Sequence, residues 1–171
     1  MANSGEKTGL YSTGGKFLSF LLSQEQYGLE ILKVVEIFGM MKITAVPRAP
    51  KYLKGVINLR GKIIPVMDLR LRFSLEERPY DNKTCIIVVT GERAEQELTV
   101  GLIVDTVLEV KDFPAEMISP SPDYGAGLDT DFIIGMGRDG DEQVTILLDL
   151  EKILPAEHID IPVTSESSAA Q

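Results

Sequence analysis

Cysteine and histidine, the residues that form disulfides and most structural zinc sites, are nearly absent from this chain. Its 171 residues include one cysteine, one histidine and no tryptophan. A single cysteine cannot form an internal disulfide, so nothing in the sequence requires an oxidising compartment. One cysteine and one histidine also cannot build a structural zinc site of the Cys/His type. The sequence therefore excludes folds that depend on disulfides or on such a zinc site.

Positive charge and long apolar runs are also scarce. Lys and Arg number 17 against 26 Asp and Glu, which gives a formal net charge of −9. This charge argues against a phosphate backbone as the main partner. The apolar runs Phe17–Leu22 and Ile63–Met67 are far shorter than the ~20 residues of a membrane helix. Residues 1–15 contain no apolar stretch of the signal-peptide type. We therefore expect a cytoplasmic protein whose partners are other proteins.

Short apolar runs of strand length dominate the rest of the chain. The clearest is Thr84–Thr90, which is rich in β-branched residues, and Gly or Pro separates many of the others. This spacing predicts a mainly β protein built from a sandwich or small barrels. Asp68 and Asp149 are candidate N-caps of two helices of about a turn and a half. We expect one domain over 16–155, between polar tails at 1–15 and 156–171.

An internal repeat refines this prediction. Residues Tyr27–Ile37 and Val100–Val110 align at an offset of 73 positions, and two later segments align at offsets of 80 and 81. The matched pairs are Gly28 with Gly101, Leu29 with Leu102, Val34 with Val107, Glu36 with Glu109, Gly55 with Gly135, and Val66–Leu69 with Leu147–Leu150. The repeat predicts two similar β lobes of about 70–80 residues each. The alternative is chance similarity among strands rich in Val and Leu.

Few residues suggest catalysis or a cofactor. Gly135, Gly137 and Gly140 match the dinucleotide-binding string, but acidic and strand-like residues follow where a helix should begin, so we expect a hairpin and no cofactor. His158 lies beside the tail, where a general base is poorly held. Cys85 lies at the head of an apolar strand and is interpreted as a small core residue. A small all-β enzyme acting through Asp68 and Asp149 is an alternative, although matching positions in two lobes should not converge.

The most distinctive segment is Pro47–Phe73, in which the turn Asn58-Leu59-Arg60-Gly61 separates two strand-like runs. An Asn and an Arg before a Gly favour a tight turn that displays its side chains. The segment resembles the signature of the CheW family, the coupling proteins of bacterial chemotaxis. Tyr27–Ile37 and Val100–Val110 resemble the family's neighbouring blocks, and the resemblance covers about residues 16–155.

The resemblance implies two SH3-like five-stranded β-barrels packed side by side, with short helices. We expect lobe one over about 23–80 and lobe two over about 81–155, with strands possibly exchanged between them. It also implies a non-enzymatic adaptor between chemoreceptor cytoplasmic tips and the regulatory domain of a CheA-type histidine kinase. Such an adaptor would be recruited to membrane receptor arrays without inserting into the membrane, and would be a monomer when isolated. An alternative is a CheV-like or kinase-titrating scaffold in another chemosensory pathway.

The resemblance also implies sites for both partners. In the family, the receptor's helical hairpin lies in an apolar groove between the lobes. Carried over, the receptor-binding candidates are Val34, Glu36, Ile37, Arg60, Val110 and Gly135. The kinase-binding candidates lie in the Val56–Met67 hairpin and are Val56, Ile57, Asn58, Ile63 and Ile64. Phe38, Met40 and Met41 stand where the family often has polar or basic residues, which predicts an altered receptor preference.

Overall fold

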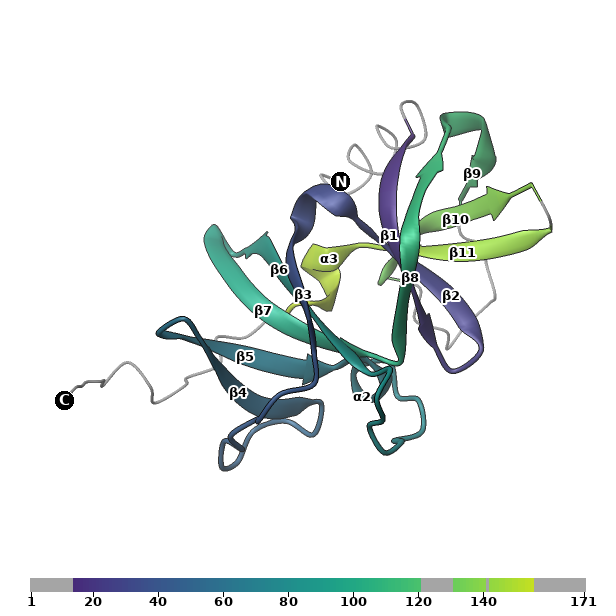
Figure 1. The fold of residues 1–171 in the computed structure, drawn as a ribbon. Helices are drawn as coiled ribbons and strands as arrows, with labels where there is room; N and C mark the ends of the chain where they lie inside the picture. Colours follow the sequence, from purple (N-terminus) through teal and green to yellow (C-terminus); the bar gives the residue numbers. More distant parts are fainter. Residues whose placement is uncertain (1–13, 121–130, 141, 156–171) are drawn as a thin grey trace.

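The computed structural model of the chain describes residues 14–120, 131–140 and 142–155. Over these residues the chain forms strands connected by tight turns, short helices and longer loops (Figure 1). The strands are β1 (Gly15–Leu22), β2 (Glu25–Glu30), β3 (Val34–Gly39), β4 (Leu53–Leu59), β5 (Lys62–Asp68), β6 (Cys85–Arg93), β7 (Gln96–Val104), β8 (Thr106–Phe113), β9 (Ile118–Ser119), β10 (Ile133–Asp139) and β11 (Gln143–Leu148). The helices are the 3-10 turns η1 (Ile31–Lys33) and η2 (Ala115–Met117), and α2 (Leu69–Arg72) and α3 (Leu150–Ile153).

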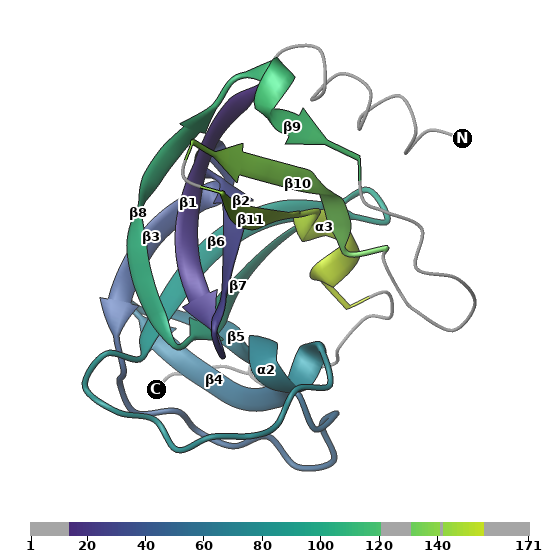
Figure 2. The ribbon, with the colours of Figure 1, turned by 90° about the vertical axis from the view of Figure 1, so that its right-hand side faces the viewer.

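The strands form two curled sheets, which confirms the prediction of a mainly β protein. The sheet of lobe A has the order β8-β1-β2-β11-β10-β9, and the sheet of lobe B has the order β3-β6-β7-β5-β4. In lobe A, the chain continues from β8 through η2 into β9, which pairs with β10 and so brings the two ends of the sheet together. In lobe B, Thr44 follows β3 and bridges to Val56 on β4. The two lobes lie against each other, as Figure 2 shows from the side.

The two lobes exchange strands, which the expected bounds of about 23–80 and 81–155 allowed. Lobe A takes β1 and β2 from the start of the chain, and its other strands follow residue 105. Lobe B takes β3, β4 and β5 and then β6 and β7, which lie beyond residue 84. Each half of the sequence therefore contributes one hairpin, β1–β2 or β6–β7, to one lobe and its remaining strands to the other.

The internal repeat has a direct structural counterpart. Gly28 lies opposite Leu147 in the parallel pair β2–β11, and Gly101 lies opposite Val66 in the parallel pair β7–β5. These are the residues that the sequence repeat matches. A Cβ atom at Gly101 would lie 2.9 Å from the Ile86 side chain, and one at Gly28 would lie 3.2 Å from Leu147. Close packing against neighbouring strands therefore explains why both matched positions are glycine.

The largest apolar cluster lies between the lobes. It joins buried residues of both, such as Phe20 and Leu29 of lobe A with Ile87 and Leu102 of lobe B. Smaller clusters fill each barrel. Strand β6 faces both environments, because Ile86 belongs to the lobe B barrel and its neighbour Ile87 to the cluster between lobes. Alternation along one strand thus explains why the run at 84–90 is apolar at almost every position.

Closure of lobe B depends on a glycine on β4. Gly55 has a φ angle of +148°, and a Cβ atom there would lie 2.0 Å from the Thr44 carbonyl oxygen. We expect Gly55→Ala to lower the free energy of unfolding by about 3 kcal/mol or more, because backbone strain adds to a clash with main-chain atoms. Chemical denaturation measures this loss. Gly39→Ala is the control, since a Cβ atom at Gly39 meets no atom within 4 Å. Equal midpoints for the two variants would contradict the role of Gly55.

Candidate protein-binding surface

Strands β3 and β8 are edge strands of their sheets and carry exposed apolar side chains. Figures 1 and 2 place both strands along the same side of the molecule. Ile37 on β3 is 41% exposed and Val110 on β8 is 49% exposed. Their cross-strand neighbours are Ile87 and Leu18, which belong to the cluster between the lobes. The two strands therefore extend the core between the lobes to the surface.

The same face contains two further valines. Val34 lies opposite Val89, and Val107 lies opposite Phe20, and both valines pack against the cluster between the lobes. We call Val34, Ile37, Val107 and Val110 the interlobe apolar surface. The sequence analysis named three of these residues and missed Val107. The repeat could have found it, because Val107 matches Val34 at the same offset by which Val110 matches Ile37.

Arg60 and Glu36 form an ion pair on lobe B, which contributes β3 to this surface. Arg60 and Gly61 occupy a two-residue hairpin turn with φ angles of +53° and +87°, and the Asn58 side chain accepts a hydrogen bond from the Gly61 amide. The turn therefore displays the Arg60 side chain, as the sequence predicts. Its guanidinium donates to both Glu36 carboxylate oxygens, at 2.8 and 2.5 Å. These hydrogen bonds hold the pKa of the Glu36 carboxyl below its ordinary value.

A shallow hollow of about 420 Å³ borders this ion pair. It lies on lobe B, and its lining residues come from β3 and β4 through β7: Val35, Glu36, Leu59, Arg60, Lys62, Ile64, Val88, Thr90, Glu97 and Thr99. Phe38 lies on the barrel side of β3, and the Arg60 guanidinium lies 6.0 Å from the centre of its ring. The lining combines apolar and charged groups, which suits a protein partner better than a metal ion.

Gly135 does not lie on the exposed part of this surface. It is buried on β10, an interior strand of lobe A, opposite Leu147. Gly55 has the matching position in lobe B, opposite Val66, and the strand pairing is irregular beside both glycines. Burial and the lack of a side chain argue against direct contact with a partner. Gly135 thus occupies a barrel position, and its assignment as a receptor-binding residue stays a prediction.

The kinase-binding candidates on β4 and β5 divide into buried and exposed residues. Val56, Ile57 and Ile64 are 6%, 1% and 4% exposed, so their side chains cannot meet a partner. Ile57 and Ile64 lie directly opposite each other and fill the lobe B barrel. Asn58 and Ile63 form the next pair and are exposed, since successive side chains of a strand point to opposite faces. Asn58 and Ile63 are therefore the two kinase-binding candidates with exposed side chains, and the assignment of all five stays a prediction.

Phe38 lies near the end of β3, and Met40 and Met41 follow this strand. Phe38, Met40 and Met41 pack against the core of the lobe B barrel. Side chains that fill a barrel do not distinguish one receptor from another. The prediction of an altered receptor preference from these residues therefore loses its basis, because their apolar character serves packing.

Residues that could support catalysis are dispersed in the structure. Asp68 caps α2 by accepting a hydrogen bond from the Arg70 amide, whereas Asp149 occupies the N-cap position of α3 in the other lobe. Cys85 is half-buried, with its thiol 3.3 Å from the Lys83 carbonyl. His158 lies outside the described residues. Among the residues that the structure describes, no group of three or more His, Cys, Asp or Glu side chains could hold a metal ion, and no helix could span a membrane.

Comparison with known proteins identifies closely similar chains. A model of the CheW-like domain matches residues 16–158. Chemotaxis protein CheW of Klebsiella aerogenes is 41% identical over 149 residues, which are 86% of each chain. Protein FrzA of Myxococcus xanthus is 28% identical over 81% of this chain and 84% of its own length. The crystal structure of scaffolding protein TtCheW from Thermoanaerobacter tengcongensis superposes with a TM-score of 0.74 at 36% identity, covering 85% of this chain and 97% of that one.

Proposed function

This chain belongs to the CheW family, and we propose that it is a chemotaxis adaptor. In this role it couples chemoreceptor cytoplasmic tips to a CheA-type histidine kinase. The family is one of non-catalytic scaffolds, and its fold of two SH3-like lobes is the fold of this chain. In this role the protein is cytoplasmic, is recruited to receptor arrays at the membrane, and is a monomer in isolation.

The observation that carries the receptor half of the proposal is the interlobe apolar surface, with the Arg60–Glu36 pair on the barrel side of the same strand, β3. A helix presents apolar side chains at positions three and four apart, and a surface that receives it needs apolar contacts along its length. Val34, Ile37, Val107 and Val110 supply these contacts from two strands on one side of the molecule. The Arg60–Glu36 pair adds fixed charges that favour one orientation of the helix.

For the kinase half, we propose the exposed face at the tip of the β4–β5 hairpin. Ile63 is 38% exposed, and its cross-strand partner Asn58 is exposed beside it. Asn58 lies two positions before Arg60, and Ile63 lies two positions after Gly61. The hairpin turn therefore holds both residues rigidly. A rigid, partly apolar strand face suits contact with another β domain.

A two-partner binding assay tests the proposal. The chain should retain both a chemoreceptor cytoplasmic tip fragment and the regulatory domain of a CheA-type kinase. Arg60→Ala should weaken binding to the tip roughly tenfold or more, since arginine is prominent among residues that dominate interfaces. The unfolding midpoint should change little, because Arg60 lies in an exposed turn.

Lys54→Ala is the matched control for Arg60→Ala. Lys54 also forms an ion pair from the β4–β5 hairpin, with Glu77 at 2.6 Å, but Glu77 belongs to the loop that follows α2. This control should bind the tip as the wild type does. Retention of neither partner by the wild-type chain would sink the proposed function, and equal losses in both variants would remove Arg60 from the site.

A further inference from the structure

The chain passes between the lobes at two crossovers within the described residues. The first is η1, which leads from β2 of lobe A into β3 of lobe B. The second is Asp105, the single residue between β7 of lobe B and β8 of lobe A. Each crossover therefore directly precedes one of the two strands that form the interlobe apolar surface.

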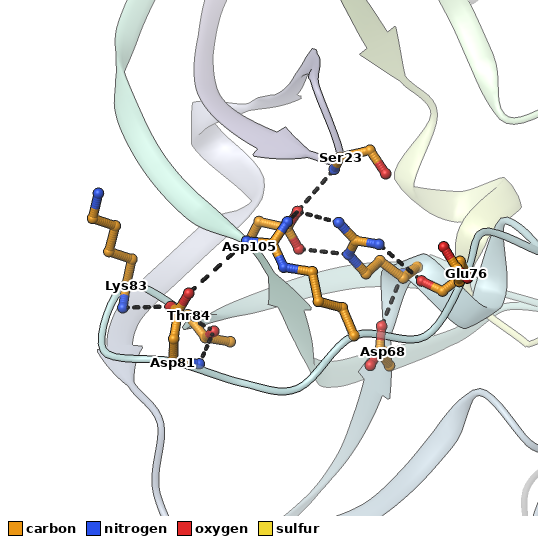
Figure 3. Close-up of polar contacts among 9 residues, drawn as sticks. Ser23, Asp68, Glu76, Asp81, Lys83, Thr84 and Asp105 are labelled. Carbon is orange, nitrogen blue, oxygen red and sulfur yellow. Dashed lines mark hydrogen bonds and ion pairs between the residues drawn. The ribbon is translucent and has the colours of Figure 1, made fainter.

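Asp105 is held by groups from both lobes (Figure 3). Arg70 of α2, on lobe B, donates to its two carboxylate oxygens at 2.8 and 2.7 Å. The Ser23 amide, in the β1–β2 turn of lobe A, donates to the same carboxylate at 2.8 Å, and the Asp105 amide donates to the Leu21 carbonyl at 3.1 Å. The Asp105 side chain is 14% exposed and that of Arg70 is 8% exposed. The second crossover is thus tied to lobe B by a nearly buried, bidentate ion pair and to lobe A by two hydrogen bonds with main-chain groups.

The surroundings of Arg70 are equally ordered. Its guanidinium also donates to the Glu76 carbonyl at 2.8 Å, and the Asp68 carboxylate accepts from the Arg70 amide and from the Tyr80 hydroxyl. Burial acts to raise the pKa of the Asp105 carboxyl, but the hydrogen bonds from Arg70 and Ser23 lower it below its ordinary value. The Asp105 carboxylate therefore stays ionised at neutral pH, as the ion pair requires.

The first crossover has a corresponding ion pair. Lys33 of η1 directly precedes β3, and its ammonium donates to the Glu151 carboxylate of α3 at 2.7 Å. Glu151 also accepts from the Glu92 amide at 3.3 Å, and the Arg93 guanidinium contacts its carbonyl. Because Glu92 and Arg93 belong to β6 of lobe B, α3 of lobe A is held against both the crossover and the other lobe.

The two ion pairs occupy matching places with opposite charge. Arg70 and Glu151 are both the second residue of their helices, and they differ by 81 positions, the offset that relates Val66 to Leu147. Their partners Asp105 and Lys33 both lie at a crossover.

We infer that the Arg70–Asp105 and Lys33–Glu151 pairs are positioning contacts that hold β8 and β3 at the separation a receptor helix needs. The inference rests on the proposed function of the interlobe apolar surface. Thr106 and Val107 follow Asp105 directly, and Val34 follows Lys33 directly, so a shift at either crossover moves the valines of that surface. None of the four charged residues has to touch the receptor for this effect.

The test measures binding of a chemoreceptor tip fragment and of the kinase regulatory domain separately. Glu151→Gln removes the ion pair without replacing Lys33, and Asp105→Asn removes the other pair without replacing Arg70. Each variant should weaken tip binding roughly fivefold or more, which is the usual size of an energetic coupling between separate sites. Binding of the kinase domain should change less than about twofold, because its proposed contact at Asn58 and Ile63 lies away from both crossovers. Lys33→Arg should keep wild-type affinity, since the positive charge remains.

Lys54→Met is the control for Glu151→Gln, because the Lys54–Glu77 pair is as close as the Lys33–Glu151 pair but joins β4 to the loop after α2 and includes no residue of η1 or α3. If Asp105→Asn fails to fold, Glu151→Gln still decides, because Glu151 is 31% exposed. Unchanged tip affinity in Glu151→Gln would overturn the inference, and so would equal losses for tip and kinase. A wild-type chain that binds no tip would overturn the proposed function itself, which the variants alone cannot do.

Discussion

Val110→Asp is expected to abolish binding of the receptor tip while the protein stays folded. Val110 is 49% exposed on β8, next to Leu18 of the core between the lobes. When a helix covers this position, the new carboxylate is buried without a partner, which costs several kcal/mol. We expect at least a hundredfold loss in affinity, measured by calorimetric titration with the tip fragment, and a thermal midpoint within a few degrees of the wild type.

Val144→Asp is the matched control for Val110→Asp. Val144 is 45% exposed and also lies on a strand of lobe A, but on β11 and away from β3 and β8. Its replacement makes the same chemical change at almost the same exposure. Tip binding that survives Val110→Asp, or is lost equally in both variants, would contradict the placement of the receptor on the interlobe apolar surface.

The exchange of strands predicts that neither half of the chain folds alone. A fragment of residues 1–82 contains β1 to β5, and a fragment of residues 83–171 contains β6 to β11. The first fragment lacks β6 and β7, which separate β3 from β5 in lobe B, and the second lacks β1 and β2, which separate β8 from β11 in lobe A. Both fragments therefore contain incomplete sheets and expose their share of the cluster between the lobes.

Each fragment by itself should be unfolded, and an equimolar mixture should regain the fold. Amide NMR spectra of the two fragments, alone and mixed, measure this directly. Reassociation in the mixture is the internal control, since it excludes chemical damage as the reason for unfolding. A well-dispersed spectrum from either fragment alone would contradict the reciprocal exchange and would favour lobes that are continuous in sequence.

Local features of the fold were predictable because they depend on neighbouring residues. The turn at Arg60-Gly61 and the N-cap at Asp68 follow from side chains that act within three positions. The run at 84–90 was correctly predicted as a strand, and the repeat correctly matched Gly28 with Gly101. Both are patterns of residue type along the chain, which strand periodicity and close packing impose directly.

Burial within a strand was harder to predict. Val56, Ile57 and Ile64 were predicted to bind the kinase and Gly135 to bind the receptor, whereas all four are buried. A run that is apolar on both faces gives no alternation from which the exposed side can be identified. Which residues of such a run face a barrel depends on strand pairing with distant segments.

The sequence by itself determined the family, the mainly β class, the repeat and most of the apolar residues of the proposed receptor surface. Tertiary structure decided which hairpin joins which lobe, and it brought Lys33 to Glu151 and Arg70 to Asp105, pairs separated by 118 and 35 positions. The physical reason is that propensity, capping and turn chemistry act within a few residues. Contacts between lobes depend on which sheet edges meet, and that pairing is a property of the whole folded chain.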